Sequence, residues 1–368
     1  MLNTGSSSLK YELIDLDGGA RRVGVVDEVT DQEAAISTVI DELGAASVDV
    51  VGHRVVHGGT SFTAPTLLDE AAVAELRRLV PLAPLHLPAN LAAIDAARRR
   101  WPDVPHVAVF DTAFHRTVPA AAHRYAVPRA WYEEHGVRRY GFHGTSVAYV
   151  SARAAEVLAR PLGDLDLIVA HLGNGASITA VHHGASIDTS MGLSPLEGLV
   201  MGTRSGDVDP TVLGHVAAAT GRPIDDVLEE LSTASGLLGL CGASDMRVVT
   251  ERAGDGDDDA ALAMDVVVHR LRRYVGAFLA VLGRCDALVF TAGIGEHSAV
   301  IRRRVCAGLE GLGIAVDGDR NRRAEPIISP DTSPTAVLVV PTDEAAEIAG
   351  QAAALLAAHS PPPPGDQP

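Results

Sequence analysis

The chain alternates between short β-rich runs that end in glycine turns and alanine-rich segments of helical period. The β-rich runs occupy 48–59, 106–115, 165–187, 286–296 and 336–344. The helical segments include 69–82, 90–100, 146–160 and 260–283. Strands that alternate with helices pack in layers, because each helix covers the sheet that its neighbouring strands form. The pattern therefore predicts an α/β fold.

The run 165–187 departs from this alternation. Its Asn174-Gly175 and His183-Gly184 pairs are typical of tight hairpin turns, so we expect an antiparallel meander here and mixed sheets overall. Two further stretches of the chain favour irregular structure. The acidic run 254–259 predicts a solvated loop ahead of a helix, and the proline-rich residues 361–368 predict a disordered tail.

Length and charge narrow the possible functions. A chain of 368 residues is too long for one compact core and suits two domains. The net charge of −17 argues against a general surface for nucleic acid or anionic membranes, so an anionic substrate needs local arginines. No apolar stretch approaches the ~20 residues of a membrane span. The three cysteines form no CxxC pair, which favours a reducing cytoplasm without disulfides.

Three segments share one design, in which a β-run leads into a glycine turn: LNTGSSSLKYELID, IVAHLGNGASITAV and LVFTAGIGEHS. The first two return as another strand, and the third leads toward a helix. Exposed backbone N–H groups in such turns, and at helix N-termini, bind phosphate. A single glycine turn is more often a plain structural turn. The three together indicate a nucleotide site.

Polar residues at the ends of apolar strands are the second signal. Arg54 lies within an apolar strand, which fits either an anion-binding residue or a structural ion pair. Arg204 lies in a long loop rich in glycine and serine, and loops of this kind are often functional. Asp111 follows a strand, where capping the next turn is its simplest role. His86, His143 and His171 lie in turns, but they lack the spacing of a structural zinc site.

Taken together, these segments resemble the acetate kinases, within the group of acetate, propionate and butyrate kinases. The similarity runs, in the family's order, through NTGSSSLKYELID, GHRVVHGG, LAPLH, VFDTAFH, RRYGFHGTS, HLGNGASI, DTSMGLSPLEGLVMGTRSGDVDP, SGLLGLCGASDMR, FTAGIGE and PTDEAAEIA. It covers nearly the whole chain.

The resemblance implies two actin-like α/β domains, of the ribonuclease H-like superfamily of sugar kinases and heat-shock ATPases, around an interdomain cleft. We expect an N-terminal domain of residues 1–114 plus 345–360 and a C-terminal nucleotide-binding domain of residues 115–344. The resemblance further implies ATP and ADP as co-substrates, Mg²⁺ (with Mn²⁺ as a substitute), acetate and acetyl phosphate as substrates, and a cytoplasmic homodimer.

The family's functional residues map onto this chain motif by motif. The catalytic set is Arg54, Asp111, His143 and Arg204. The acyl-binding set is Arg54, Val56, Leu85, His86, Phe142 and Pro195. The nucleotide-binding set is Asn3, Ser6, Ser8, Lys10, His171, Leu172, Gly173, Asn174, Gly175, Asp245, Arg247, Gly293, Ile294, Gly295 and Glu296. The metal set is Asn3 and Glu344.

These residue types suit phosphoryl transfer to a carboxylate. The acceptor is already ionised near neutral pH, so the reaction needs charge stabilisation and positioning but no general base. Asp111 is therefore expected to orient an arginine, a histidine or Mg²⁺. Val56 adds bulk to the acyl pocket and favours acetate over propionate, although one methylene is worth only about 1–3 kcal/mol. A propionate-preferring kinase and a silent ATP-binding module are the alternatives.

Several positions differ from the usual family pattern: Leu87, Val147, His297, Asp343 and Ala345. None of them carries an assigned role, but they affect the expected nucleotide affinity and local hydrogen bonding. Relatives also carry more apolar residues ahead of the residue equivalent to Asn3. We therefore expect a shortened first strand, a less stable N-terminal domain, and an upstream coding segment that supplies the missing residues.

Overall fold

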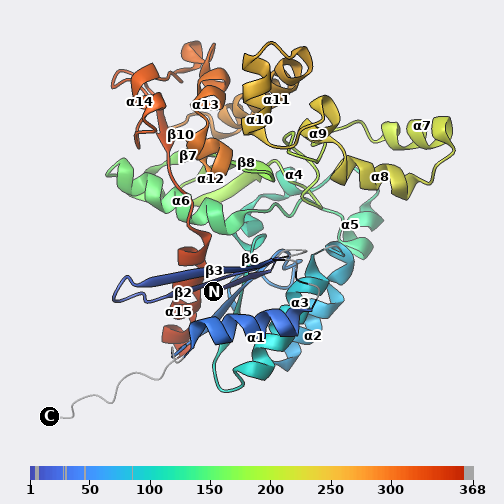
Figure 1. The fold of residues 1–368 in the computed structure, drawn as a ribbon. Helices are drawn as coiled ribbons and strands as arrows, with labels where there is room; N and C mark the ends of the chain where they lie inside the picture. The colour runs from blue at the N-terminus through green and yellow to red at the C-terminus, as the bar shows by residue number, and fades with distance from the viewer. Residues whose placement is uncertain (5–7, 28, 30, 45–46, 85, 360–368) are drawn as a thin grey trace. The chain divides into compact units, whose positions relative to one another are not determined.

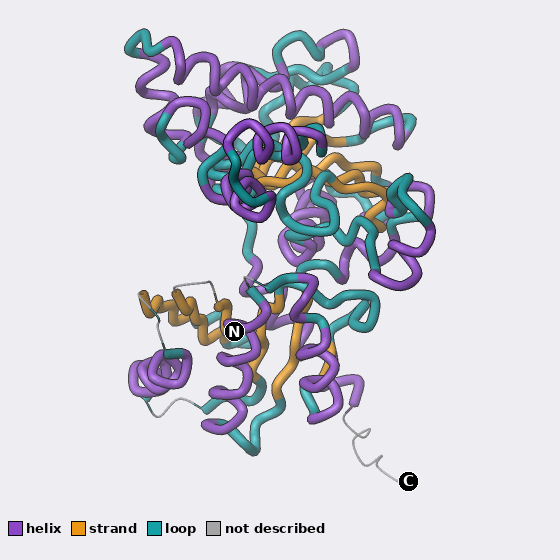
Figure 2. Tube along the Cα trace, turned by 90° about the vertical axis from the view of Figure 1, so that its right-hand side faces the viewer, coloured by secondary structure: helices purple, strands orange, loops and turns teal. Residues whose placement is uncertain are grey.

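The computed structural model describes residues 1–4, 8–27, 29, 31–44, 47–84 and 86–359. Of Ser8, Asp27 and Ile40 it describes the backbone only. Two compact units make up the chain (Figures 1 and 2). Unit 1 comprises Met1–Phe114 and the segment from Asp343 onward, and unit 2 comprises His115–Thr342. Asp343 and Glu344 therefore belong to unit 1, whereas the boundary predicted from the sequence left both in the C-terminal domain.

Unit 1 is built on a six-stranded mixed sheet in the order β3-β2-β1-β4-β6-β5. Its strands are β1 (Leu2–Thr4), β2 (Ser8–Ile14), β3 (Arg21–Asp27), β4 (Val51–Val55), β5 (Thr66–Leu67) and β6 (His106–Phe110). β1 pairs antiparallel with β2 and parallel with β4, and β4 pairs parallel with β6. Because parallel strands β1, β4 and β6 end at the same edge, their C-terminal residues are brought together.

Helices cover both faces of this sheet. They are α1 (Gln32–Leu43), α2 (Glu70–Arg78), α3 (Leu87–Arg100) and α15 (Glu344–His359), with a 3₁₀ turn at Val80–Leu82. One core contains Leu2, Leu9 and Tyr11 packed against α1 and α3, and the other contains Val107 and Val109 packed against α15. A cavity of about 590 Å³ lies beside the start of β1, lined in part by β2, Val51 and α15.

Unit 2 is built on a five-stranded sheet in the order β11-β10-β7-β8-β9. Its strands are β7 (Asp166–Leu172), β8 (Ala176–His182), β9 (Ala185–Thr189), β10 (Ala287–Thr291) and β11 (Ala336–Val339). β10 runs parallel to β7 and β11, whereas β7, β8 and β9 form an antiparallel meander. Every residue of β7 and β10 is buried, as expected for central strands covered on both faces.

The helices of unit 2 follow the sheet in chain order. They are α4 (Ala120–His123), α5 (Arg129–His135), α6 (Gly144–Val157), α7 (Thr211–Thr220), α8 (Ile224–Thr233), α9 (Gly236–Cys241), α10 (Met246–Gly254), α11 (Asp258–Leu282), α12 (Ala292–His297), α13 (Ala299–Cys306) and α14 (Gly318–Arg322). Short 3₁₀ turns occupy Ala113–Thr117, Leu162–Asp164 and Glu310–Leu312. Within the unit, α6 lies on one side of the sheet and α11 on the other (Figure 1).

The predicted turns and mixed sheets are confirmed. His183 and Gly184 form the two-residue loop between β8 and β9, and both have positive φ, as a type I′ turn requires. One prediction about the acidic run is wrong in part. Residues 254–259 are not simply a loop, because Gly254 ends α10 and Asp257 caps the N-terminus of α11 by accepting from the amide of Ala260. Carboxylates stabilise a helix N-terminus, which explains why the run is acidic.

No helix among the described residues is long and apolar enough to cross a membrane. The three cysteines are free thiols, as the sequence predicted.

Candidate active site

In unit 1 the predicted residues gather at the C-terminal ends of β1, β4 and β6. Arg54, near the end of β4, donates from Nε to Asp111 Oδ1 at 3.0 Å and from Nη2 to Oδ2 at 2.5 Å. Its Nη1 donates to Asn3 Oδ1 at 3.1 Å, and Glu344 Oε2 lies 3.6 Å from Nε. Two carboxylates and one amide oxygen therefore surround a single guanidinium group.

The electrostatics of this cluster follow from its composition. Asp111 is only 1% exposed, and Arg54 is partly buried. Burial opposes the charge of Arg54, but Asp111 and then Glu344 outweigh it and raise the pKa of the arginine. Arg54, Asp111 and Glu344 together carry one surplus negative charge. Such a surplus, next to an amide oxygen, suits a hard cation such as Mg²⁺, which binds one or two carboxylates.

A buried amide holds the strand ends of unit 1 in place. Asn90, on α3, accepts from the amide of Val56 at 3.1 Å and donates to the carbonyl of Thr4 at 3.2 Å. It thereby ties the residue after β4 to the end of β1, next to Asn3 and Arg54. Asn90 was not predicted, although a polar residue among the apolar positions of a helix was a usable signal.

The remaining unit 1 predictions are spread more widely. Val56 is buried, His86 precedes α3, and Lys10 is exposed on β2, opposite Asn3 in the strand register. Ser6, Leu85 and the tail 361–368 lie outside the described residues, as does the side chain of Ser8.

In unit 2 the centre of the candidate site is the hairpin turn Gly173–Gly175 between β7 and β8. A Cβ atom built on Gly175 would lie 3.5 Å from Arg204 Nη1 and 3.6 Å from His143 Nε2. The arginine and the histidine therefore converge on the turn. His143 precedes α6 with φ of 59°, a backbone conformation that non-glycine residues seldom adopt and that often marks functional sites.

Arg204 has an unusual environment for a cation. Its Nη1 donates to the carbonyl of Pro195 at 3.2 Å and lies 3.8 Å from Met201 Sδ. No carboxylate in the described part of the chain lies within ion-pair distance of it. Burial lowers the pKa of Arg204, so an anion brought to this guanidinium would relieve a desolvation cost.

Histidines 143 and 171 are fixed by stacking and by hydroxyl groups. Their rings stack with centroids 4.1 Å apart. Nδ1 of His143 hydrogen-bonds Ser177 Oγ at 3.0 Å, and Nδ1 of His171 hydrogen-bonds Ser146 Oγ at 2.8 Å. These bonds fix both rings, so His143 is held with its other nitrogen facing Gly175. Neither serine was singled out from the sequence.

The predicted nucleotide loops also meet. Leu172, Gly173 and Ile294 line one small apolar cavity of about 20 Å³, together with Met246, which follows Asp245. Gly293 and Gly295 lie in α12, and Glu296 accepts from the amide of Thr342 at 3.1 Å. Asn174 Oδ1 occupies the place that a Cβ on Gly202 would take.

Arg247, which was predicted to bind the nucleotide, lies at the surface. Its side chain is 91% exposed and paired with Asp245, the N-cap residue of α10.

Phe142 is buried, and its carbonyl accepts from His115 Nε2 at 2.9 Å. Pro195 lies in the loop after β9. A separate group of metal-ligating residues, Asp166, His182 and His183, lies at the opposite end of β7 from His171. Asp166 already forms a hydrogen bond with His182 and an ion pair with Arg284, so its carboxylate has protein partners without a metal ion.

Comparison with known proteins decides the family. The model of the acetokinase family matches residues 18–350. The chain belongs to the acetokinase family. A Streptomyces avermitilis protein named acetate kinase is 51% identical over 391 residues, covering 97% of this chain and 96% of its own.

Two solved structures show the same fold. A Porphyromonas gingivalis acetate kinase has a TM-score of 0.91 at 39% identity, and a Francisella tularensis propionate kinase has 0.90 at 37%. Each comparison covers 96% of this chain and 98% of the other. Acetokinase membership and these TM-scores confirm the predicted family, the actin-like α/β fold class and the enzyme class, a phosphotransferase with a carboxyl acceptor.

Proposed function

We propose that the chain catalyses reversible, Mg²⁺-dependent transfer of the γ-phosphoryl group of ATP to acetate, giving acetyl phosphate and ADP. The observation that carries the assignment to this site is Arg204, a desolvated guanidinium beside His143 with no carboxylate in ion-pair range among the described residues. A phosphoryl group in transfer spreads negative charge over its equatorial oxygens, which arginine stabilises through paired N–H donors.

The proposed chemistry is direct in-line transfer. The acetate carboxylate attacks the γ-phosphorus, the bond to the β-phosphate oxygen breaks, and ADP leaves with the electron pair. Arg54 and Arg204 bind the equatorial oxygens, and His143 donates a further hydrogen bond. Asp111 orients Arg54 through its two contacts and takes no proton, because the acceptor is already ionised.

Asn3 and Glu344 are proposed to hold Mg²⁺ through oxygen atoms. When bound, the ion would neutralise charge on the nucleotide phosphates. Glu344 begins α15, and both residues already face Arg54. The metal would therefore relieve the surplus negative charge of this cluster.

The nucleotide is proposed to be bound by two turns, by α12 and by the start of α10. Backbone amides of the turn Gly173–Gly175 and of the first-strand turn, with Ser6, Ser8 and Lys10, would hold the phosphates. Gly293, Ile294, Gly295 and Glu296 of α12, with Asp245 and Arg247, would bind the adenosine. Free N–H groups at turns and helix N-termini are suited to such anions.

Val56, Leu85, His86, Phe142 and Pro195 are proposed to bind the acyl group. The buried isopropyl group of Val56 favours the acetyl methyl group over a longer chain. Propionate is the second candidate substrate, because one of the similar solved structures is a propionate kinase.

We also propose that the enzyme is a cytoplasmic homodimer. Free thiols are typical of a reducing compartment, and the chain presents exposed apolar side chains on α8 at Ile224 and Leu228. Light scattering of the purified protein would give about twice the chain mass of 38.3 kDa for a dimer.

The deciding experiment traps acyl phosphate with hydroxylamine, in the presence of ATP and Mg²⁺, for acetate, propionate and butyrate in parallel. We expect turnover with acetate and a lower kcat/KM with propionate. Arg54→Ala and Arg204→Ala should each lower kcat by orders of magnitude, and the exposed Arg129→Ala should not. ATP binding without acyl phosphate from any of the acids would instead identify a silent ATP-binding module.

A further inference from the structure

The loop that follows β9 carries both Pro195 and Arg204, and two clusters of side chains help to fasten it. It runs without regular secondary structure from Ser190 to Pro210. Backbone hydrogen bonds anchor the part around Arg204, where the amides of Gly202 and Ser205 donate to the carbonyls of Asn174 and Leu231. The part that carries Pro195 is held by side chains, and long loops need such contacts to keep one conformation. The orientation of the Arg204 guanidinium group, which donates to the Pro195 carbonyl, therefore depends on the residues that hold the Pro195 part of the loop.

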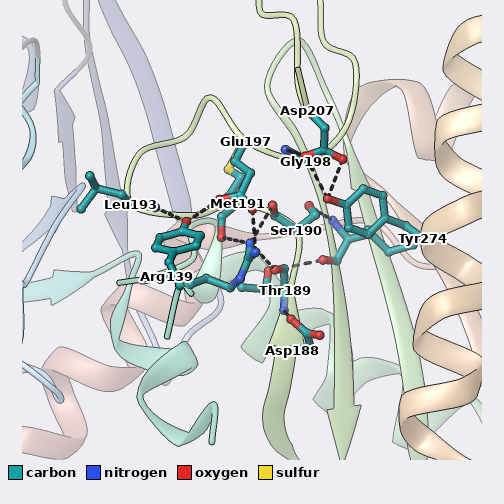
Figure 3. A network of polar contacts seen from close by, with 12 residues as sticks. Arg139, Asp188, Thr189, Ser190, Met191, Leu193, Glu197, Gly198, Asp207 and Tyr274 are labelled. Carbon is teal, nitrogen blue, oxygen red and sulfur yellow. Dashed lines mark hydrogen bonds and ion pairs between the residues drawn. The ribbon is translucent and has the colours of Figure 1, made fainter. Parts of the chain in front are cut away.

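The first fastening point is Arg139. Its Nη1 donates to three successive carbonyl groups, those of Thr189, Ser190 and Met191, at 2.9, 3.0 and 3.1 Å. Its Nη2 donates to Glu197 Oε1 at 2.6 Å. Figure 3 shows the guanidinium group at the centre of these acceptors. One side chain thus holds both the start of the loop and a residue seven positions farther along.

Tyr125 completes this contact. Its hydroxyl group donates to Glu197 Oε2 and accepts from the amide of Leu193 at 3.0 Å. Gly192 lies directly against the pair, since a Cβ atom built there would be 1.8 Å from Glu197 Oε2 and 2.0 Å from the Tyr125 hydroxyl oxygen. Only glycine leaves room for this contact. We refer to Arg139, Glu197 and Tyr125 as the loop clamp.

The groups of the loop clamp keep their protonation states near neutral pH. Burial opposes the charge of Arg139, but Glu197 outweighs it and raises the pKa of the arginine. Burial and the nearby Glu197 carboxylate raise the pKa of Tyr125, so its hydroxyl group remains a donor across the neutral range. These two effects keep the hydrogen bonds intact at physiological pH.

The second fastening point lies at the other end. Asp207 Oδ1 accepts from the amide of Gly198, and both Asp207 oxygens accept from the hydroxyl group of Tyr274 at 3.0–3.1 Å. Arg270 donates to the carbonyls of Gly198 and Asp207 at 2.8 and 3.0 Å. The segment between Glu197 and Asp207, which contains Arg204, is therefore held on both sides.

The clamp acts on Arg204 through Pro195. The Pro195 carbonyl lies between Leu193 and Glu197, both of which the clamp holds, and it accepts from Arg204 Nη1. The clamp also contacts residues 139–142, which directly precede His143. Arg139 is the first of them, and the amide of the next residue, Tyr140, donates to the carbonyl of Gly192 at 3.0 Å. The loop clamp thus contacts both the segment that orients Arg204 and the segment that precedes His143.

We propose that Arg139, Glu197 and Tyr125 are positioning residues for the phosphoryl-transfer reaction, holding the loop so that Pro195 orients the Arg204 guanidinium group. This inference rests on the proposed function. It adds three residues that act through Arg204 and bind neither substrate. Their loss should act on kcat more than on the KM for ATP, because a misplaced guanidinium weakens transition-state charge stabilisation.

The test is a double-mutant cycle on the full chain, with kcat and both KM values from the acyl-phosphate assay. Tyr125→Phe removes one hydroxyl group, and Gly192→Ala forces a methyl group into the clamp. Each should lower kcat about 10- to 100-fold while changing the KM for ATP less than about threefold. Arg129→Lys, on an exposed arginine of α5, is the matched control and should match the wild type.

The second half of the cycle uses Arg204→Lys, which keeps the charge but loses the planar fork. If the clamp acts through Arg204, Tyr125→Phe should lower kcat far less in this background than in the wild type. Equal effects in both backgrounds, or a wild-type kcat for both clamp variants, would overturn the proposal. A wild-type chain that makes no acyl phosphate would instead refute the proposed function, so the two failures are distinct.

Discussion

At the scale of single residues, two partly buried arginines show how this chain prepares for anionic substrates. Arg54 is held by the carboxylate of Asp111, which fixes its orientation before any ligand arrives. Among the described residues, the Arg204 guanidinium group contacts a carbonyl oxygen and a sulfur atom but no carboxylate, which leaves its charge available. One arginine is therefore oriented by an ion pair, and the other offers an uncompensated charge to the ligand.

Asp111→Asn should lower kcat at least about 10-fold, because an amide offers Arg54 one acceptor where the carboxylate offers two. The KM for ATP should change little. Steady-state kinetics would measure both, with Asp95→Asn as the control, since Asp95 forms a more exposed pair with Arg77. Unchanged kcat in Asp111→Asn would remove Asp111 from the orienting role.

His115 should make stability depend on pH. Burial lowers its pKa to about 4, below the ordinary value of 6.5, so protonation favours the unfolded chain. The stabilisation is complete above about pH 6.5 and is lost as pH falls toward 4, by at most about 3 kcal/mol.

Urea unfolding at pH 7.5, 6 and 5 would measure this loss, and His115→Gln should show a shallower dependence than the wild type. The exposed His135→Gln serves as the control. An identical pH dependence in the wild type and His115→Gln would contradict the assignment.

At the scale of elements, α3 does more than cover the sheet. Asn90 is nearly fully buried in the helix and bonds the carbonyl of Thr4, the last residue of β1, and the amide of Val56, which follows β4. Those ends carry Asn3 and Arg54. The positions of the candidate residues of unit 1 thus depend on one helix residue.

Asn90→Ala should lower the free energy of unfolding by about 1–3 kcal/mol, since it leaves a buried N–H and a buried C=O without partners. Chemical denaturation would measure the loss. Arg99→Ala, on the exposed face of the same helix, should stay within about 0.5 kcal/mol of the wild type. A neutral Asn90→Ala would mean that water replaces the amide.

The hairpin turn Gly173–Gly175 offers a second test at this scale. A methyl group on Gly175 would meet Arg204 and His143 at ordinary contact distance, so Gly175→Ala should fold normally. It should nevertheless lower kcat, because the methyl group occupies the space that both side chains face. Circular dichroism and the acyl-phosphate assay together would check this; loss of folding would refute the steric argument.

At the scale of the whole molecule, the chain enters unit 2 after Phe114 and leaves it after Thr342. Each unit has its own sheet and core, and Asp343 marks the return. Its carboxylate forms a bidentate pair with Arg21, at 2.5 and 2.7 Å, and caps α15 by accepting from the amide of Ala346. Position 343, where the family pattern differs, is thus used to dock and start the final helix.

Because the units have separate cores, we expect calorimetry to resolve two unfolding transitions. Asn90→Ala should lower the temperature of the unit 1 transition only. A single sharp transition whose calorimetric and van't Hoff enthalpies agree would show instead that the units unfold as one.

Much of this was predictable from local patterns. The β-runs, the main helices and the two hairpin turns are encoded by periodicity and by glycine, so the sequence located them. It missed β3, which begins with two arginines, and α1, whose apolar residues are only weakly periodic. The resemblance supplied Arg54, Arg204 and His143 as candidates, but Asn90, Arg139 and Tyr125 were missed because their partners are distant in the sequence.

The sequence by itself determined the layered α/β class, the glycine turns and the family, because these depend on side-chain size, hydrophobic period and backbone freedom within short segments. Only the tertiary structure decided which polar groups are paired. In the folded chain Arg54 pairs with Asp111, 57 residues away, and Arg204 donates to the carbonyl of Pro195, 9 residues away. The packing of strands and loops selects these partners. Charge compensation is a property of three-dimensional neighbours, and those neighbours distinguish an oriented arginine from an available one.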